Sequence, residues 1–203
     1  MPDPADDSST ASPRAAESTA VLFDRIRQGD EGARQRLFER FLPILRRWAH
    51  GRLPGSARGL ADTDDLVQIT LIRAFNRLGE FEARREGAFL AYLRQILLNS
   101  VREELRRATR KPSAASVDEH LVDPAPSVIE QAVGRETLTR YETALAALPE
   151  EHREAVILRI EFDYSYPEIA EALGRSSANA ARMAVTRALV KLAEAMDDES
   201  ERA

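Results

Sequence analysis

The sequence predicts an all-α protein made of two small helical domains joined by a flexible linker. Apolar residues recur at three- and four-residue spacings from Ala20 to Ala108, and again from Ser127 to Met196, as expected for amphipathic helices. No stretch of useful length alternates between apolar and polar residues as a strand would. Between the two periodic regions the composition shifts to KPSAAS, followed by Pro124 and Pro126, which is typical of a linker.

These observations divide the 203 residues into five segments. The first residues are mostly Pro, Ser, Ala and Asp, which have little to bury and favour disorder. We expect a disordered tail over 1–19, a first domain over 20–110, a linker over 111–127, a second domain over 128–197 and a tail over 198–203.

The first domain is expected to contain four helices. Glycines and prolines between residues 51 and 59 separate the second helix from the third. The third begins near Asp62-Thr63-Asp64, which has good N-cap chemistry, and runs to about Leu78. The fourth runs from about Gly87 to Ala108.

Helical periodicity in the second domain runs from Ser127 to Leu148 and resumes after Pro149. Two segments follow, Tyr166–Leu173 and Ser177–Met196, with Gly174 where the chain must turn. Together they have the form of a helix-turn-helix, whose second helix Ser176 or Ser177 can cap.

Composition excludes several classes of function. The chain has no cysteine, and its three histidines are too scattered to suggest a zinc site, so we expect neither a metal nor a cofactor. No P-loop, nucleophile elbow or glycine-rich cradle is present, which argues against an enzyme. No apolar run approaches the roughly 20 residues that span a bilayer, and the N-terminus is no secretory signal. We expect a cytoplasmic protein without membrane insertion.

The net charge of −5 conceals an asymmetry along the chain. Residues 21–111 contain 19 Lys/Arg and 12 Asp/Glu, whereas residues 112–203 contain 9 and 18. An acidic pI would argue against nucleic-acid binding, but the basic first half requires each region to be judged by itself.

The last helix has two distinct faces. At 100° per residue, Ala181, Val185, Ala188, Leu189 and Leu192 share one face. From Arg175 to Leu192 there are four cations and no acid, which suits insertion into a DNA major groove. The candidate DNA-binding residues are Arg175, Ser177, Asn179, Arg182, Met183, Thr186, Arg187 and Lys191. The alternative is an amphipathic hairpin whose arginines only keep a surface hydrated.

The third helix carries a second candidate surface. Val67, Leu71, Ala74, Phe75 and Leu78 form its core stripe. Isoleucines among polar residues outside that stripe are typical of a partner-binding face, unless a neighbouring helix covers them. The residues of this surface are Asp64, Asp65, Gln68, Ile69, Ile72 and Asn76.

The fourth helix carries a polar stripe at spacings of four, three and four residues. Aromatic residues and arginines precede it, a combination that suits single-stranded DNA because bases stack on rings and cations hold phosphates. Most helical aromatics belong to the core, however, and Phe89 at least is expected to be buried. The candidate residues are Phe81, Arg84, Arg85, Tyr92, Gln95, Asn99, Arg102 and Arg106.

In this order, the segments resemble the extracytoplasmic-function (ECF) group of bacterial RNA polymerase sigma factors. The resemblance covers residues 21–110 and 130–195. It is carried by Asp64-Asp65-Leu66-Val67-Gln68 with Arg73-Ala74-Phe75, and by Leu148-Pro149-Glu150 with Arg153-Glu154 and Ile169-Ala170. Ile69-Thr70 departs from the family pattern and enlarges the apolar patch, and the turn GRSSANAARM is one residue longer than usual.

The resemblance implies a promoter-recognition subunit, with sigma region two as the first domain and region four as the second. The Asp65/Gln68 helix would bind the β′ clamp of core RNA polymerase, and region four its β flap. Residues 81–107 would melt and read the −10 element, and the last helix would read the −35 element. An anti-sigma factor is a further implied partner. The rival interpretations are a stand-alone helix-turn-helix regulator, which has no need of the Asp65/Gln68 helix, and a structural adaptor, which leaves the cationic helix unexplained.

Overall fold

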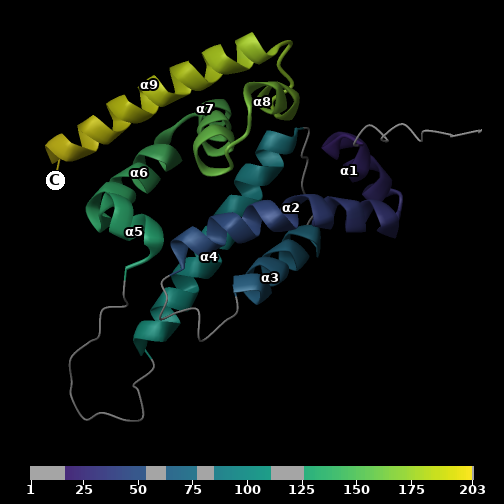
Figure 1. Ribbon diagram of the computed structural model, residues 1–203, viewed down its shortest axis with the longest axis horizontal. Helices are drawn as coiled ribbons and strands as arrows, with labels where there is room; N and C mark the ends of the chain where they lie inside the picture. Colours follow the sequence, from purple (N-terminus) through teal and green to yellow (C-terminus); the bar gives the residue numbers. More distant parts are fainter. Residues whose placement is uncertain (1–16, 54–62, 77–84, 111–125, 203) are drawn as a thin grey trace, which may run out of the picture.

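The computed structural model describes residues 17–53, 63–76, 85–110 and 126–202, with side chains described to residues 106 and 198 in the last two ranges. All regular structure in these residues is helical (Figure 1). The elements are α1 (Thr19–Arg27), α2 (Glu31–Arg52), α3 (Thr63–Asn76), α4 (Glu86–Arg110), α5 (Val128–Val133), α6 (Arg135–Ala147), α7 (Glu150–Val156), η1 (Ile157–Glu161), α8 (Tyr166–Ala172) and α9 (Ala178–Arg202). The all-α prediction is confirmed for the described residues.

The first domain is formed by α1 to α4, which pack around an aromatic core. The ring of Phe89, on α4, is fully buried as expected, and meets Phe23 at 4.9 Å and Phe41 at 5.3 Å in edge-on contacts. Phe75 of α3 closes the cluster, with its ring centroid 6.4 Å from that of Phe89. Such pairs add to the stabilisation from buried apolar area, and they fix which faces of α3 and α4 remain outside.

The second domain ends in the predicted helix-turn-helix. A capping box of Ser165 and Glu168 starts α8, and the Gly174 amide closes its last turn on the Glu171 carbonyl at 3.1 Å. Gly174 has φ +62°, a left-handed conformation that favours glycine. The Ser177 hydroxyl then accepts the Ala180 amide at 3.2 Å, so Ser177 caps α9.

Two local features differ from the sequence-based prediction. Residues 157–161 form a π-helical turn, η1, which continues α7 and which the 3.6-residue periodicity cannot reveal. Helix α9 extends to Arg202, beyond Met196, so residues 198–202 continue the helix. Residues 1–16, 77–84 and 111–125 lie outside the described residues, and with them Leu78 and most of the expected tail and linker.

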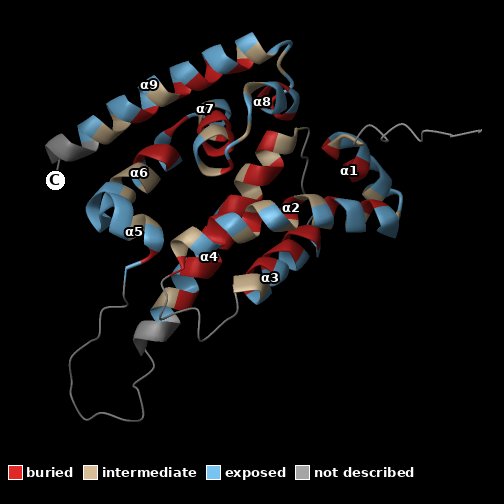
Figure 2. Ribbon diagram, viewed as in Figure 1, coloured by how far each residue is buried: buried red, intermediate tan, exposed pale blue. Residues whose placement is uncertain are grey.

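The two domains lie against each other. In Figure 1, α4 runs through the centre of the molecule and α2 crosses it, with α3 on one side of α4 and α7 and α9 on the other. One cluster of buried apolar residues extends through both domains, including Leu90 and Leu97 of α4 and Leu158 and Leu173 of the second domain. Figure 2 colours parts of both α4 and α7 as buried.

Candidate nucleic-acid and partner interfaces

The predicted partner surface on α3 is exposed in the structure. Val67, Leu71, Ala74 and Phe75 face the core, as predicted. Ile69 and Ile72 are 44% and 53% exposed, so no described helix covers them. Asp65, Gln68 and Asn76 are exposed beside them, while Asp64 is half-buried and pairs with Arg46 of α2 at 2.8 Å. The same helix therefore presents a continuous apolar and polar surface outward.

The polar stripe of α4 is also exposed. Gln95, Asn99, Arg102 and Arg106 lie at the surface, and the Gln95 amide donates to the Asn99 side-chain oxygen at 3.2 Å. Tyr92 is half-buried, with its ring 6.5 Å from that of Phe89, so only part of it can reach a ligand. Phe81 and Arg84 lie outside the described residues.

The last helix, α9, separates its two faces as predicted. Ala181, Val185, Ala188 and Leu192 are buried, and Leu189 is partly buried. The opposite face exposes Asn179, Arg182, Met183, Thr186, Arg187 and Lys191. The Arg182 guanidinium donates to the Asn179 side-chain oxygen at 3.1 Å. Among the described residues, Arg182, Arg187 and Lys191 form no ion pair, so this face is positive and open.

Two of the predicted DNA-binding arginines meet at one carboxylate. Arg85, immediately before α4, lies 3.3 Å from Glu151 Oε1, and Arg175 of the helix-turn-helix lies 2.9 Å from Glu151 Oε2. Hydrogen bonds from Arg175 and then from Arg85 lower the pKa of Glu151. The contact joins the two domains at the edge of their interface.

A buried ion cluster lies at the centre of that interface. Glu161 of η1 is the central acceptor: Arg94 of α4 donates to its two oxygens at 2.8 and 2.9 Å, and Arg52 of α2 lies at 3.0 Å. The Trp48 indole N–H and the Tyr141 hydroxyl also donate to it. The Arg94 guanidinium also pairs with the Glu142 carboxylate of α6 at 2.7 Å, which adds a second acid to the cluster.

The pKa values reflect this neutralisation. Burial by itself would raise the pKa of Glu161, but Arg94 and Arg52 hold it below its ordinary value. Burial likewise opposes the charge of Arg94, whereas Glu161 and Glu142 raise its pKa. Burial raises the pKa of Tyr141, and the adjacent Glu161 carboxylate raises it further, so the phenol remains a donor. The cluster is therefore charged and hydrogen-bonded despite its burial.

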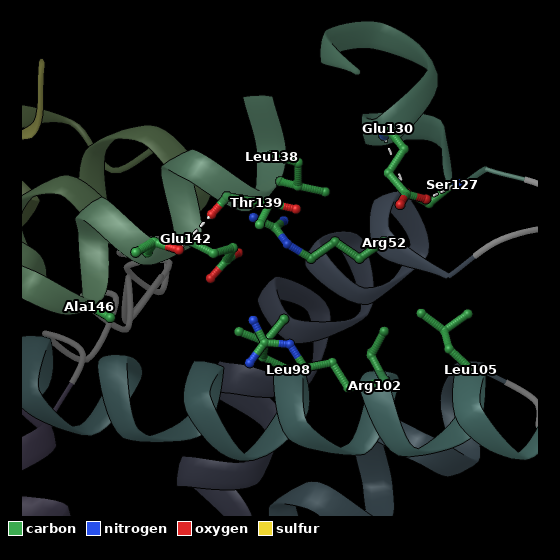
Figure 3. A pocket seen from close by; sticks show the side chains of 12 residues that line it. Arg52, Leu98, Arg102, Leu105, Ser127, Glu130, Leu138, Thr139, Glu142 and Ala146 are labelled. Carbon is green, nitrogen blue, oxygen red and sulfur yellow. Dashed lines mark hydrogen bonds between the residues drawn. The ribbon is translucent and has the colours of Figure 1, made fainter. Parts of the chain in front are cut away.

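Two grooves flank this cluster. The first, of about 490 Å³, lies between the apolar side of α4 and the helices α5 and α6. Figure 3 shows Leu98, Arg102 and Leu105 on one side and Leu138, Thr139 and Glu142 on the other, with Arg52 between them. The second, of about 390 Å³, is lined by residues that include Trp48, Gly51 and Ile160. Leu138 lines both grooves.

Sequence reasoning missed the ion cluster. Two signals were available: Arg94 interrupts the apolar run of Leu90, Leu93 and Leu97, and Glu161 stands directly before the buried Phe162. In the sequence, however, Arg94 and Glu161 could equally be exposed residues at the edge of a helix face. Nothing along the chain shows that the two meet.

Among the described residues, no group of three or more His, Cys, Asp or Glu side chains could hold a metal ion. None of the described helices is long and apolar enough to cross a membrane. The surfaces that these helices expose are a face of α9 with Arg182, Arg187 and Lys191, a polar stripe on α4 and an apolar-polar surface on α3.

Comparison with known proteins identifies the class. Residues 37–111 match the family Sigma-70 region 2, and residues 138–192 match Sigma-70, region 4. The chain is similar to the ECF RNA polymerase sigma factor SigD of Mycobacterium tuberculosis, with 30% identity over 176 residues, 85% of this chain and 81% of SigD. It is also similar to the sigma factor CarQ of Myxococcus xanthus, with 30% identity over 178 residues, 87% of this chain and 96% of CarQ.

A solved structure of CnrH in complex with the cytosolic domain of CnrY covers 90% of this chain and 99% of that chain, with 27% identity and a TM-score of 0.40. The two matched regions and the sequence relatives define a two-domain RNA polymerase sigma factor. This chain belongs to the ECF group of RNA polymerase sigma factors.

Proposed function

We propose that this sigma factor binds core RNA polymerase through the exposed α3 surface and promoter DNA through α4 and α9, acting in the cytoplasm by recognition rather than catalysis. The single observation that carries the proposal is the face of α9, where Asn179, Arg182 and Thr186 are exposed and no acid neutralises Arg182, Arg187 or Lys191 within the described residues. The helix-turn-helix that contains α9 supports the proposal, because motifs of this kind insert their second helix into a major groove.

On α9 the residues divide by position. Arg182 and Thr186 lie one turn apart near the centre of the exposed face, and Asn179 lies a turn earlier, so all three can approach base edges of the −35 element. Arg187 and Lys191 lie toward the flank and suit phosphate contacts. A bidentate arginine–guanine contact contributes about 1–3 kcal/mol of base discrimination, whereas a phosphate contact supports all sequences alike.

The decisive experiment is transcription by reconstituted polymerase on a promoter library. Arg182→Ala is expected to reduce transcription from promoters with an intact −35 element and to change base preference at one or two positions. Lys191→Ala is expected to weaken binding uniformly and to lower the salt slope by about one. An unchanged −35 preference for every substitution from Asn179 to Arg187 contradicts base reading by α9.

On α3, the proposed partner is the β′ clamp of core polymerase, and region four is proposed to contact the β flap. Gln68 and Ile72 are exposed and do not pack in the hydrophobic core. Gln68→Ala combined with Ile72→Asp should therefore weaken binding to core RNA polymerase while preserving the fold. Polymerase affinity and circular dichroism together test this. An unfolded double variant, or one with normal affinity, contradicts the assignment of this surface.

The proposal includes an anti-sigma factor as a further partner. Family membership supports it, and the two grooves offer apolar surface shared by both domains, so a helix placed there would contact both at once. For an anti-sigma protein that binds this chain, Leu138→Asp should reduce affinity because Leu138 lines both grooves. Val190→Asp, at an exposed apolar position on α9 outside the grooves, is the control.

A further inference from the structure

The arrangement of the two domains brings the proposed −10 and −35 surfaces too close together for one promoter. Arg85, assigned to the −10 element, and Arg175, assigned to the −35 element, contact opposite oxygens of the same Glu151 carboxylate at 3.3 and 2.9 Å. The two elements are centred about 25 base pairs apart, roughly 85 Å at 3.4 Å per base pair. A chain in this arrangement cannot bind both elements at once.

The contact between the domains is specific in its chemistry. Glu161 is nearly inaccessible, with 2% of its side chain exposed, and its neighbour Arg94 has 5%. Among the residues that the structure describes, four donate to Glu161, three of them from the first domain: Trp48, Arg52 and Arg94. The Arg52 guanidinium also lies over the Trp48 ring, 4.0 Å from its centroid. The hydrogen bonds from Trp48, Arg52 and Arg94 to Glu161 join the first domain to the second. The Arg52–Trp48 contact lies within the first domain and orients two of these donors.

The contact is also close in its packing. At Gly87, in the first turn of α4, an added Cβ would lie 2.8 Å from Leu173 Cδ2, 3.0 Å from Glu154 Oε2 and 3.3 Å from Leu158 Cδ1. The Arg47 guanidinium donates to the Phe162 carbonyl at 2.9 Å, and the Tyr164 hydroxyl donates to Glu86 at 3.0 Å. The second domain therefore packs against both α2 and α4 of the first domain.

We infer that this arrangement is a closed, inactive state of the sigma factor and that the cluster of Glu161 with Trp48, Arg52, Arg94 and Glu142 is the latch that holds it closed. The inference rests on the proposed function, since it is the DNA surfaces that closure holds together. A buried ion cluster suits a reversible latch: its attraction largely offsets the desolvation of its charges, and on opening every charge returns to water. The exposed α3 surface lets the closed chain meet polymerase before opening.

Covalent closure tests the inference directly. The chain has no cysteine, so cysteines introduced at Gly51 and Ile160, which line the second groove from opposite domains, can be linked by a bismaleimide with a disulfide in its spacer. A Cβ at Gly51 meets nothing within 4 Å, Ile160 is 55% exposed, and neither residue belongs to the surfaces proposed for polymerase or DNA. The linked chain should bind core polymerase but lose transcription about tenfold or more. Reductive cleavage of the spacer should restore transcription.

Forced opening gives the converse test. Glu161→Lys places a cation against Arg52 and Arg94, whereas Asp24→Lys makes the same charge change at an exposed position of α1. Trp48 is the chain's only tryptophan and is 3% exposed, so opening should shift its emission to longer wavelength and increase the hydrodynamic radius. Only Glu161→Lys should show both changes, with unaltered helicity. At limiting sigma factor it should also give severalfold more transcription than Asp24→Lys.

The outcomes separate the latch from the proposed function. Full transcription by the linked chain, or identical emission and radius for Glu161→Lys and Asp24→Lys, overturns the latch. The emission and radius measurements use the isolated chain and do not depend on polymerase. If the unlinked, wild-type chain neither binds core polymerase nor supports transcription, the proposed function is the part that fails.

Discussion

Each end of the contact between the domains contains a buried glutamate, and the two carboxylates differ in their hydrogen bonding. At one end, Glu161 accepts hydrogen bonds from Trp48, Arg52, Arg94 and Tyr141. At the other end, seven residues earlier in the sequence, the carboxylate oxygens of Glu154 accept no hydrogen bond from any described residue.

The pKa values follow the difference between these sites. Arg85 lies 3.7 Å from Glu154 Oε1, too far for a hydrogen bond, and burial raises the pKa of Glu154. The pKa of Glu161 is lowered although its side chain is nearly as inaccessible, 2% exposed against 0% for Glu154. Burial alone therefore does not determine the stability of a charge: the donors around it do. The Glu161 end should hold the domains together, and the Glu154 end should oppose that contact.

The largest expected effect comes from removing the central donor at the Glu161 end. Arg94→Met leaves the buried Glu161 and the half-buried Glu142 with Arg52 as the remaining cation of the cluster among the described residues. Breaking a buried pair in this way typically costs about 3–5 kcal/mol. Urea unfolding of the full chain should show a loss of that order. A change smaller than about 1 kcal/mol would show that the cluster contributes little to the folded chain.

A smaller effect of opposite sign is expected at the other end. Glu154→Leu removes an unsatisfied buried carboxylate next to Leu158 and Leu173, so the free energy of unfolding at pH 7 should rise by about 1–3 kcal/mol. Glu150→Leu, on the exposed side of α7, is the matched control and should leave stability nearly unchanged. Destabilisation by Glu154→Leu would mean that the carboxylate has a compensating partner.

The pH dependence of stability should distinguish the same two groups. A raised folded-state pKa means that Glu154 destabilises progressively as pH rises from its unfolded value of 4.5 through its folded value. A lowered pKa means that the stabilisation by Glu161 is present above 4.5 and is lost as pH falls below it. Glu154→Gln should therefore remove the decline in the free energy of unfolding above pH 4.5. It should preserve the loss of stability below pH 4.5 that comes from Glu161. Urea midpoints measured across this range test both signs.

The smallest effect compares two helical glycines. Replacing glycine by alanine within a helix usually stabilises it by about 0.5–1 kcal/mol. Gly51→Ala should show this gain, because its added Cβ meets nothing within 4 Å. Gly87→Ala should show less or none, because its Cβ meets Leu173 at 2.8 Å and pushes the domains apart. Equal increases in stability at the two positions, measured by thermal unfolding, would show that the domain contact at Gly87 accommodates the added methyl group without loss of stability.

The sequence by itself determined the helices and the direction of their faces. Val67 and Leu71 lie inward and Ile69 and Ile72 outward on α3 because the helical repeat assigns each residue to a face whatever lies opposite. The two family motifs, with the Asp65/Gln68 helix in one and the helix-turn-helix in the other, likewise depend on short spacings that can be read along the chain.

Only the tertiary structure decided what those faces meet. Arg94 and Glu161 are 67 residues apart, and their pairing depends on how two separate domains come together. The same holds for Arg85 and Arg175, which the sequence assigned to separate DNA surfaces and which the folded chain brings to one carboxylate. Periodicity reports contacts within a helix, because those follow from its repeat. Contacts between domains depend on the shape and charge of two assembled surfaces, which no local spacing encodes.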